Sequence, residues 1–107
     1  MNEADEKAGA GTRPTPGGLF LVERRLSKTS DRQLAVLQGA LTSAAGRFST
    51  RGKGVAYVGS IFLADSGRVL SLFRADSPQT VQAVNEAALI PFASIERAVE
   101  LPGPGQP

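Results

Sequence analysis

The sequence predicts one small α+β domain in which two strand-helix-strand units follow one another, in the order β-α-β-β-α-β. Four apolar runs of eight or nine residues predict strands, and two longer segments predict helices because apolar residues recur at steps of three and four behind a helix cap. A length of 107 residues fits a single domain. We expect the folded unit to span residues 19–101, between polar, Gly- and Pro-containing tails at 1–18 and 102–107 that are disordered.

The first strand and the first helix are predicted from residues 19–26 and from the segment that begins at Ser30. The strand is a dense apolar run that ends in charged residues. Ser30 and Gln33 have the spacing of a capping box, which marks the start of a helix. Gly46 is expected to fray the end of this helix. Its apolar face is Leu34, Leu37, Leu41, Ala44, Ala45 and Phe48.

Two strands at 55–63 and 68–75, joined by the short turn 64–67, predict a β-hairpin. A four-residue loop sets Leu63 opposite Arg68, and the same register sets Val58 opposite Phe73. Tyr57 then lies opposite Arg74 on the other face. Both faces of the hairpin are largely apolar in this register.

The second helix is predicted to begin at Ser77, with Pro78 at its first position, where a missing N–H costs nothing. Pro91 is expected to end it. A last strand at 93–101 alternates apolar and polar residues, although Arg97 interrupts its apolar side. The apolar residues of this half are Val81, Val84, Ala88 and Leu89 on the helix and Ile95, Val99 and Leu101 on the strand.

Two such units fold most simply as a four-stranded antiparallel sheet with both helices on one face, the ferredoxin-like topology. Two helices cover only one face of that sheet, so the second apolar face needs another partner. A second copy of the chain, packed sheet to sheet as an isologous homodimer of the dimeric α+β barrel type, is the simplest one. The alternative is a different register, in which one face is more polar.

Composition excludes several classes of function. The chain has no Cys and no His, which removes thiolate nucleophiles, thiolate metal sites and the commonest general base. A net charge of +2 is too small to indicate a nucleic-acid partner. No apolar run approaches the roughly eighteen residues that a membrane span needs. We therefore expect a cytoplasmic protein with no nucleic-acid or membrane partner.

Charged and aromatic residues at strand ends are the first candidates for a ligand site. Glu23, Arg24 and Arg25 end an otherwise apolar strand, where charges more often reach solvent or pair across a dimer than bind a ligand. Tyr57 and Arg74, placed opposite one another, predict a cation–π pair that either holds the structure or lines a pocket.

The second helix supplies the remaining candidates. Asn85 and Glu86 lie near its end, and a buried Glu86 would act as a general base, although most helical glutamates are solvated. The basic, Gly-containing loop at 51–54 matches no phosphate-binding motif and is interpreted as a solvated loop. No catalytic residue is assigned. The candidate ligand-binding residues are Glu23, Arg25, Tyr57, Arg74, Asn85 and Glu86.

Three segments of the chain read LVER at 21–24, RVLSLFRADSP at 68–78 and VNEAALIP at 84–91. They resemble the nickel-binding-protein-like domain of unknown function 4242 family, which is typified by a bacterial protein. The resemblance implies a ferredoxin-like fold and dimers with their sheets face to face. The family pattern has a His where this chain has Asn85 and a Cys where it has Ser71. A metal ion is thus implied only by the resemblance, and no cofactor is predicted, because carboxylates alone suit harder ions than nickel.

Three classes of function are compatible with these observations. The first is a homodimeric binding module that holds a small apolar or anionic ligand. The second is a cofactor-independent enzyme, of oxygenase, isomerase or cyclase type, with a hydrophobic cavity in a dimeric ferredoxin-like barrel; it rests on analogy of fold. The third is an RNA-binding module, which needs exposed aromatic residues on the central strands. Phe20, Phe62 and Phe73 lack the surrounding basic residues that this role requires.

Overall fold

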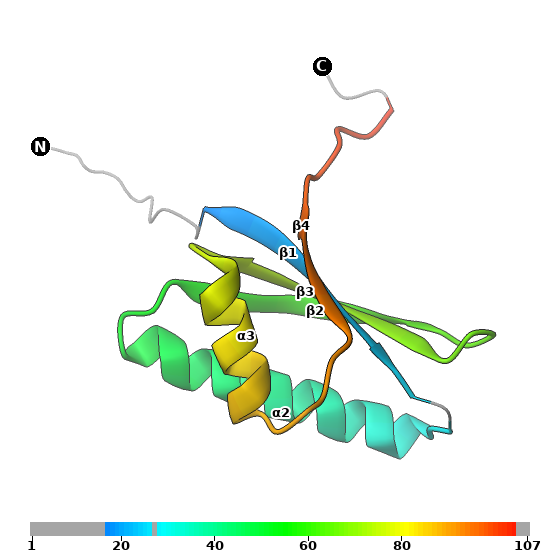
Figure 1. The fold of residues 1–107 in the computed structure, drawn as a ribbon. Coiled ribbons are helices and arrows are strands. Elements are labelled where there is room, and N and C mark those ends of the chain that lie inside the picture. The colour runs from blue at the N-terminus through cyan, green and yellow to red at the C-terminus, as the bar shows by residue number, and fades with distance from the viewer. Residues whose placement is uncertain (1–16, 27, 105–107) are drawn as a thin grey trace, which may run out of the picture.

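The computed structural model describes residues 17–26 and 28–104, and it has the ferredoxin-like architecture that the sequence predicts. The four strands form one antiparallel sheet in the order β2-β3-β1-β4. Both helices lie on one side of this sheet (Figure 1). The elements are β1 (Gly18–Arg25), α2 (Asp31–Thr50), β2 (Val55–Leu63), β3 (Arg68–Ala75), α3 (Pro78–Ala87) and β4 (Ser94–Ala98).

The strand register decides which residues face the helices. On β1, Phe20 lies opposite Phe73 and Val22 opposite Ser71, and these four side chains are buried under the helices. The alternate residues of β1 and β3 point to the opposite side of the sheet. We call that side the open face, because neither helix covers it (Figure 1).

The first helix is longer than predicted at its C-terminal end. The capping box at its start is confirmed, since the Ser30 hydroxyl accepts from the Gln33 N–H and the Gln33 side chain accepts from the Ser30 N–H. Gly46 does not fray the helix, which continues to Thr50. Leu37 and Leu41 pack the middle of α2 against the sheet, and this packing outweighs the low helix propensity of one glycine.

The second helix begins as predicted and ends earlier. The Ser77 hydroxyl accepts from the Thr80 N–H, and Pro78 is the first helical residue. The helix ends at Ala87, four residues before Pro91. Leu89 is therefore not on the buried face of the helix; it is 87% exposed and has a positive φ of 60°. Asn85 occupies the inward position instead.

The hairpin has its predicted strands and turn, but a β-bulge changes its register near Val58. From Leu63 to Gly59 the pairing with β3 is as expected, and then one residue of β2 is skipped. Tyr57 therefore lies opposite Phe73 on the helix side, and Ala56 lies opposite Arg74. The expected Tyr57–Arg74 cation–π pair is wrong, because the bulge moves Tyr57 to the other face. The Tyr57 and Phe73 rings stack instead, with centroids 5.2 Å apart.

The chain ends of the folded unit differ slightly from the expected ones. β1 begins at Gly18, one residue earlier than predicted. β4 ends at Ala98, so Val99 and Leu101 lie beyond the strand and are 77% and 79% exposed. The disorder expected for the tails falls largely on residues 1–16 and 105–107, which lie outside the described residues.

Candidate functional site

The open face carries six large aliphatic side chains from three neighbouring strands. They pair in register across the sheet: Leu21 lies opposite Leu72, and Ile61 opposite Leu70. None of them is fully buried in the single chain, and Ile61 on the edge strand is 55% exposed. The open face therefore carries an aliphatic patch that no helix covers, flanked on the same face by charged residues that include Glu23, Arg68, Arg74 and Glu96. Its aliphatic residues are Leu19, Leu21, Ile61, Leu63, Leu70 and Leu72.

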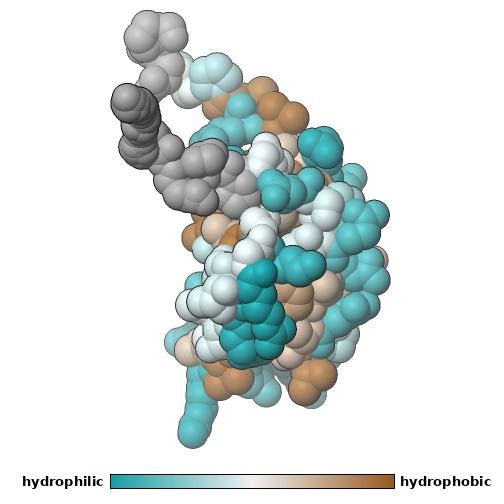
Figure 2. Space-filling view, turned by 90° about the vertical axis from the view of Figure 1, so that its left-hand side faces the viewer, coloured by the Kyte–Doolittle hydropathy of each residue, from teal (hydrophilic) through white to brown (hydrophobic). Residues whose placement is uncertain are grey.

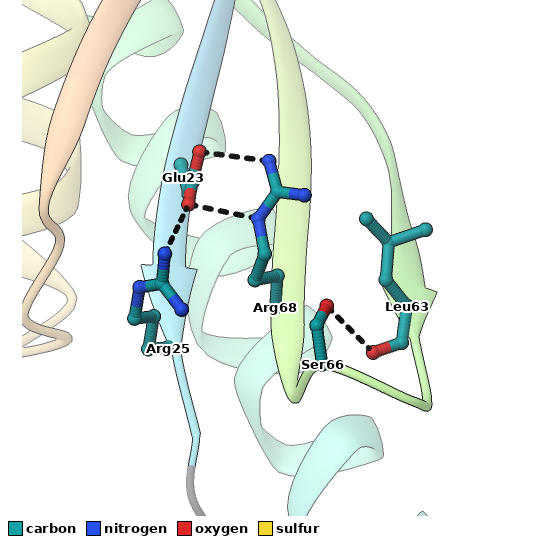
Figure 3. A network of polar contacts seen from close by, with 5 residues as sticks. All are labelled: Glu23, Arg25, Leu63, Ser66 and Arg68. Carbon is teal, nitrogen blue, oxygen red and sulfur yellow. Dashed lines mark hydrogen bonds and ion pairs between the residues drawn. The ribbon is translucent and has the colours of Figure 1, made fainter.

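An ion-pair network closes one end of the open face (Figure 3). The Arg68 guanidinium holds both carboxylate oxygens of Glu23, at 2.9 and 3.1 Å, and Arg25 approaches the same carboxylate at 3.8 Å. A two-pronged arginine contact of this kind fixes geometry as well as charge. The hydrogen bond from Arg68 lowers the pKa of Glu23 below 4.5, and the same contact raises the pKa of Arg68.

A second ion pair lies toward the other end of the open face. Arg74 donates to the carboxylate of Glu100 at 3.0 Å, and Glu100 is largely exposed. Because this pair is open to solvent, it adds little to stability. It places one more pair of opposite charges beside the aliphatic rows.

A buried arginine lies on the other side of the sheet, between β1 and the end of α3. Arg24 is 1% exposed and makes no ion pair with a carboxylate among the described residues. One guanidinium nitrogen donates to the Asn85 side-chain oxygen at 2.6 Å, and another lies 3.4 Å from the Pro91 carbonyl. Burial lowers the pKa of Arg24 to about 10. Its third nitrogen group, Nε, has no partner among the described residues.

Both ends of the Asn85 amide are hydrogen-bonded within the protein. Its oxygen accepts from Arg24, and its NH₂ group donates to the Val81 carbonyl at 2.8 Å. A metal ion bound by the Asn85 oxygen would have to compete with the Arg24 guanidinium that already occupies it. At the two positions where the resemblance implied a His and a Cys, Asn85 and Ser71 therefore offer an amide and a hydroxyl, which are not the ligands that nickel prefers. Within 17–26 and 28–104, no three His, Cys, Asp or Glu side chains gather closely enough to hold a metal.

A row of hydroxyl groups crosses β2 and β3 on the helix side. Ser71 is fully buried and lies 2.8 Å from the Ser60 hydroxyl. The Ser60 hydroxyl also contacts the hydroxyl of Tyr57. Each of the three hydroxyls is hydrogen-bonded to a neighbour in the row, so these polar groups are accommodated in the interior.

A pocket of about 330 Å³ opens between the first half of α2 and the segment that follows α3. Its walls are mostly aliphatic, and they include Leu37 from α2 and Ile90 from the α3–β4 connection. Lys28 and Thr29, from the β1–α2 connection, bring polar groups to one side. The pocket lies on the helix side of the sheet, so it is separate from the open face.

The structure does not gather the six candidate residues into one site. Glu23 and Arg25 meet at one end of the open face, and Arg74 lies toward the other. Tyr57 and Asn85 face the interior. Glu86 is exposed on α3 and accepts a hydrogen bond from the Gln82 amide, so it is solvated, as most helical glutamates are, and lacks the burial that a general base would need.

Arg24 and Arg68 have roles in binding neighbouring groups that the sequence reasoning missed. The sequence could have predicted the inward position of Arg24, because Phe20, Val22 and Arg24 lie two residues apart along β1 and so share one face. In the same way, Asn85 lies four residues after Val81 on the inward side of α3. The contact between Arg68 and Glu23 depends on the pairing of β1 with β3, which local sequence does not specify.

Comparisons with known proteins support the fold. No family model matches the chain, and no curated protein matches it. Among solved structures, the chain is similar to SCO4226 from Streptomyces coelicolor A3(2), with a TM-score of 0.65 and 21% sequence identity. The similarity covers 79% of this chain and 99% of that one. In the described part of the chain, neither helix has the length and apolar character needed to cross a membrane.

The contact between Arg24 and Asn85 gives the first testable prediction. We expect Asn85→Leu to cost about 2 to 3 kcal/mol of unfolding free energy, because it leaves a buried guanidinium without its main acceptor. The double variant Arg24→Met, Asn85→Leu should recover most of this loss, because it removes both polar partners together. Urea unfolding of the two variants measures the effect. Glu86→Ala, at the adjacent exposed position, is the control and should change stability by less than about 0.5 kcal/mol.

The Glu23–Arg68 pair predicts a pH dependence of stability. Because the folded-state pKa of Glu23 lies below its usual 4.5, the pair stabilises the fold above that pH, and the contribution is lost as the pH falls through the lowered pKa. We therefore expect Glu23→Gln to destabilise the protein at pH 7 and to match the wild type at the acid end of a urea-unfolding series. In an Arg68→Gln background the same substitution should have little effect at any pH. An equal loss at all pH values would contradict this account.

Proposed function

We propose that the protein is a homodimeric ligand-binding domain whose two subunits pack open face against open face. The observation that carries the proposal is the double-sided apolar character of the sheet. The helices bury one face, and the other presents six large aliphatic side chains that neither helix covers and that are half-buried or exposed in the single chain. A second copy offers the same aliphatic rows and so matches this surface in chemistry.

The size and the charges of the open face support self-association. Four strands of up to nine residues span roughly 500 Å², so two faces bury on the order of 1,000 Å², near the lower limit for a specific interface. Both ends carry charges of both signs, at Glu23 with Arg68 and at Arg74 with Glu100. Each charged residue of a second copy can therefore lie near a residue of opposite charge, and neither end presents charges of only one sign.

Other surfaces are less suited to a dimer. The end of the molecule seen in Figure 2, near the α2–β2 loop, has its hydrophobic residues in separate groups among hydrophilic ones.

The alternative functions have less support. Phe20 and Phe73, which an RNA-binding sheet would expose, lie under the helices. Among the described residues an enzymatic role lacks a supporting observation, because Glu86, considered as a general base only if buried, is exposed and hydrogen-bonded to a neutral amide.

The dimer predicts the effect of one charge at the centre of the open face. We expect Leu72→Arg to convert a dimer into a folded monomer, because each subunit would bring an unpaired guanidinium into the middle of the interface. Sedimentation equilibrium measures the mass, and circular dichroism verifies the fold. Val36→Arg is the matched control, since Val36 is an exposed aliphatic residue on α2 and should leave the dimer intact. A wild-type monomer at micromolar concentration would rule out the proposal.

A further inference from the structure

The pocket on the helix side has features of a binding site for a small amphipathic ligand. Its volume of about 330 Å³ lies at the lower end of the range for small-molecule sites. At about 30 Å³ for each water-sized group, it has room for roughly ten non-hydrogen atoms. Leu26, Leu37 and Ala40 contribute aliphatic lining from β1's end and from α2. Such a surface favours the apolar part of a ligand.

Leu89 is an unusual residue at a position where the end of α3 requires a left-handed conformation. The Leu89 N–H donates to the Glu86 carbonyl and the Ile90 N–H to the Asn85 carbonyl, which together end α3 in a Schellman motif. The residue at this position adopts a left-handed conformation, and glycine is its usual occupant because a side chain is strained there. Leu89 has a φ of 60° and exposes 87% of its surface.

Strain and exposure at Leu89 indicate a role in binding. A glycine would end the helix with less strain, and it would leave no large aliphatic group in water. Leu89 lines the pocket, as does Val36, which is 66% exposed on α2. A ligand that covers both side chains would remove their apolar surface from water. Residues that violate local preferences in this way gather at functional sites.

The polar side of the pocket selects the charge of the ligand. Lys28 lines it, and no Asp or Glu belongs to its lining. The Thr29 hydroxyl oxygen is buried and has no partner among the described residues. Asp31, in the first turn of α2, is not part of the lining. An ammonium beside an aliphatic cavity is complementary to a carboxylate attached to an apolar chain or ring.

We propose that this pocket binds a small amphipathic carboxylate, with the carboxylate at Lys28 and the apolar part against Leu37, Ile90 and the exposed Leu89. This inference rests on the proposed function in one respect: it names the ligand class of the proposed ligand-binding domain. It is independent of the dimer, because the lining lies on the helix side of the sheet.

The test is a titration of the full chain with octanoate, followed by amide chemical shifts in two-dimensional NMR. We expect saturable shifts at Lys28, Thr29 and residues 88–90, and about fivefold tighter binding than octan-1-ol, from the contact between opposite charges. Lys28→Gln should remove this preference. The absence of saturable binding at millimolar octanoate, shifts confined to the open face, or equal binding of octylamine would each overturn the proposal.

Leu89 provides a test that separates function from structure. We expect Leu89→Gly to raise the urea midpoint of unfolding and to weaken octanoate binding about tenfold, because the strain and the apolar contact are both removed. Leu89→Asn, which also tolerates the left-handed region, is the second variant and should weaken binding in the same way. Leu101→Gly, at an exposed leucine outside the pocket, should leave the affinity unchanged. Unchanged affinity in both Leu89 variants would contradict the proposal.

The same titration keeps the two proposals apart. The variant Leu72→Arg should bind octanoate with wild-type affinity as a monomer, because no residue of the open face lines the pocket. Loss of binding in that variant would show that the site needs the dimer, and would overturn the location argued here. A wild-type monomer that binds octanoate would remove the dimer and leave the pocket proposal standing.

Discussion

The rest of the structure depends on one constraint: a four-stranded sheet has two faces, and two helices cover only one of them. Strand alternation decides which residues reach each face, and β1, β2 and β3 carry large apolar residues on both faces. On β1, Phe20 and Val22 build the core under the helices, while Leu19 and Leu21 go to the opposite side. A sequence meant for a monomer would place polar residues there. The aliphatic residues of the open face are thus the observation on which the proposed dimer rests.

The buried side of the sheet carries its own departure from a simple core. Arg24 lies on the same face of β1 as the buried Phe20 and Val22, where strand alternation would place another hydrophobic residue. Its pKa falls to about 10 because burial penalises the charged form. Asn85 and the Pro91 carbonyl provide dipoles, yet the described residues give it no opposing charge. These contacts tie β1 to the last turn of α3 and to the segment after it. That segment includes Leu89 and Ile90, so the buried arginine also fixes one wall of the pocket.

Sequence reasoning predicted most of the fold because its signals were local. The caps at Ser30 and Ser77 and the bounds of β2 and β3 follow from a few neighbouring residues. The errors come from interactions between distant segments. The bulge beside Tyr57 places its ring against Phe73, and no local pattern specifies that contact. The candidate site was predicted less well, because burial of Arg24 and exposure of Leu89 depend on how the helices dock and where α3 ends.

The open face and the pocket on the helix side both include residues at or next to strand β1. Alternation sends Leu21 and Glu23 to the open face and Arg24 to the helix side, and Leu26, just past the strand, lines the pocket. A change in the register of β1 would therefore alter the open face, the buried arginine and the pocket together. The pairing of β1 with both β3 and β4, at the centre of the sheet, opposes such a change. The central position of β1 therefore places the proposed self-association surface on one side of the sheet and the proposed ligand pocket on the other.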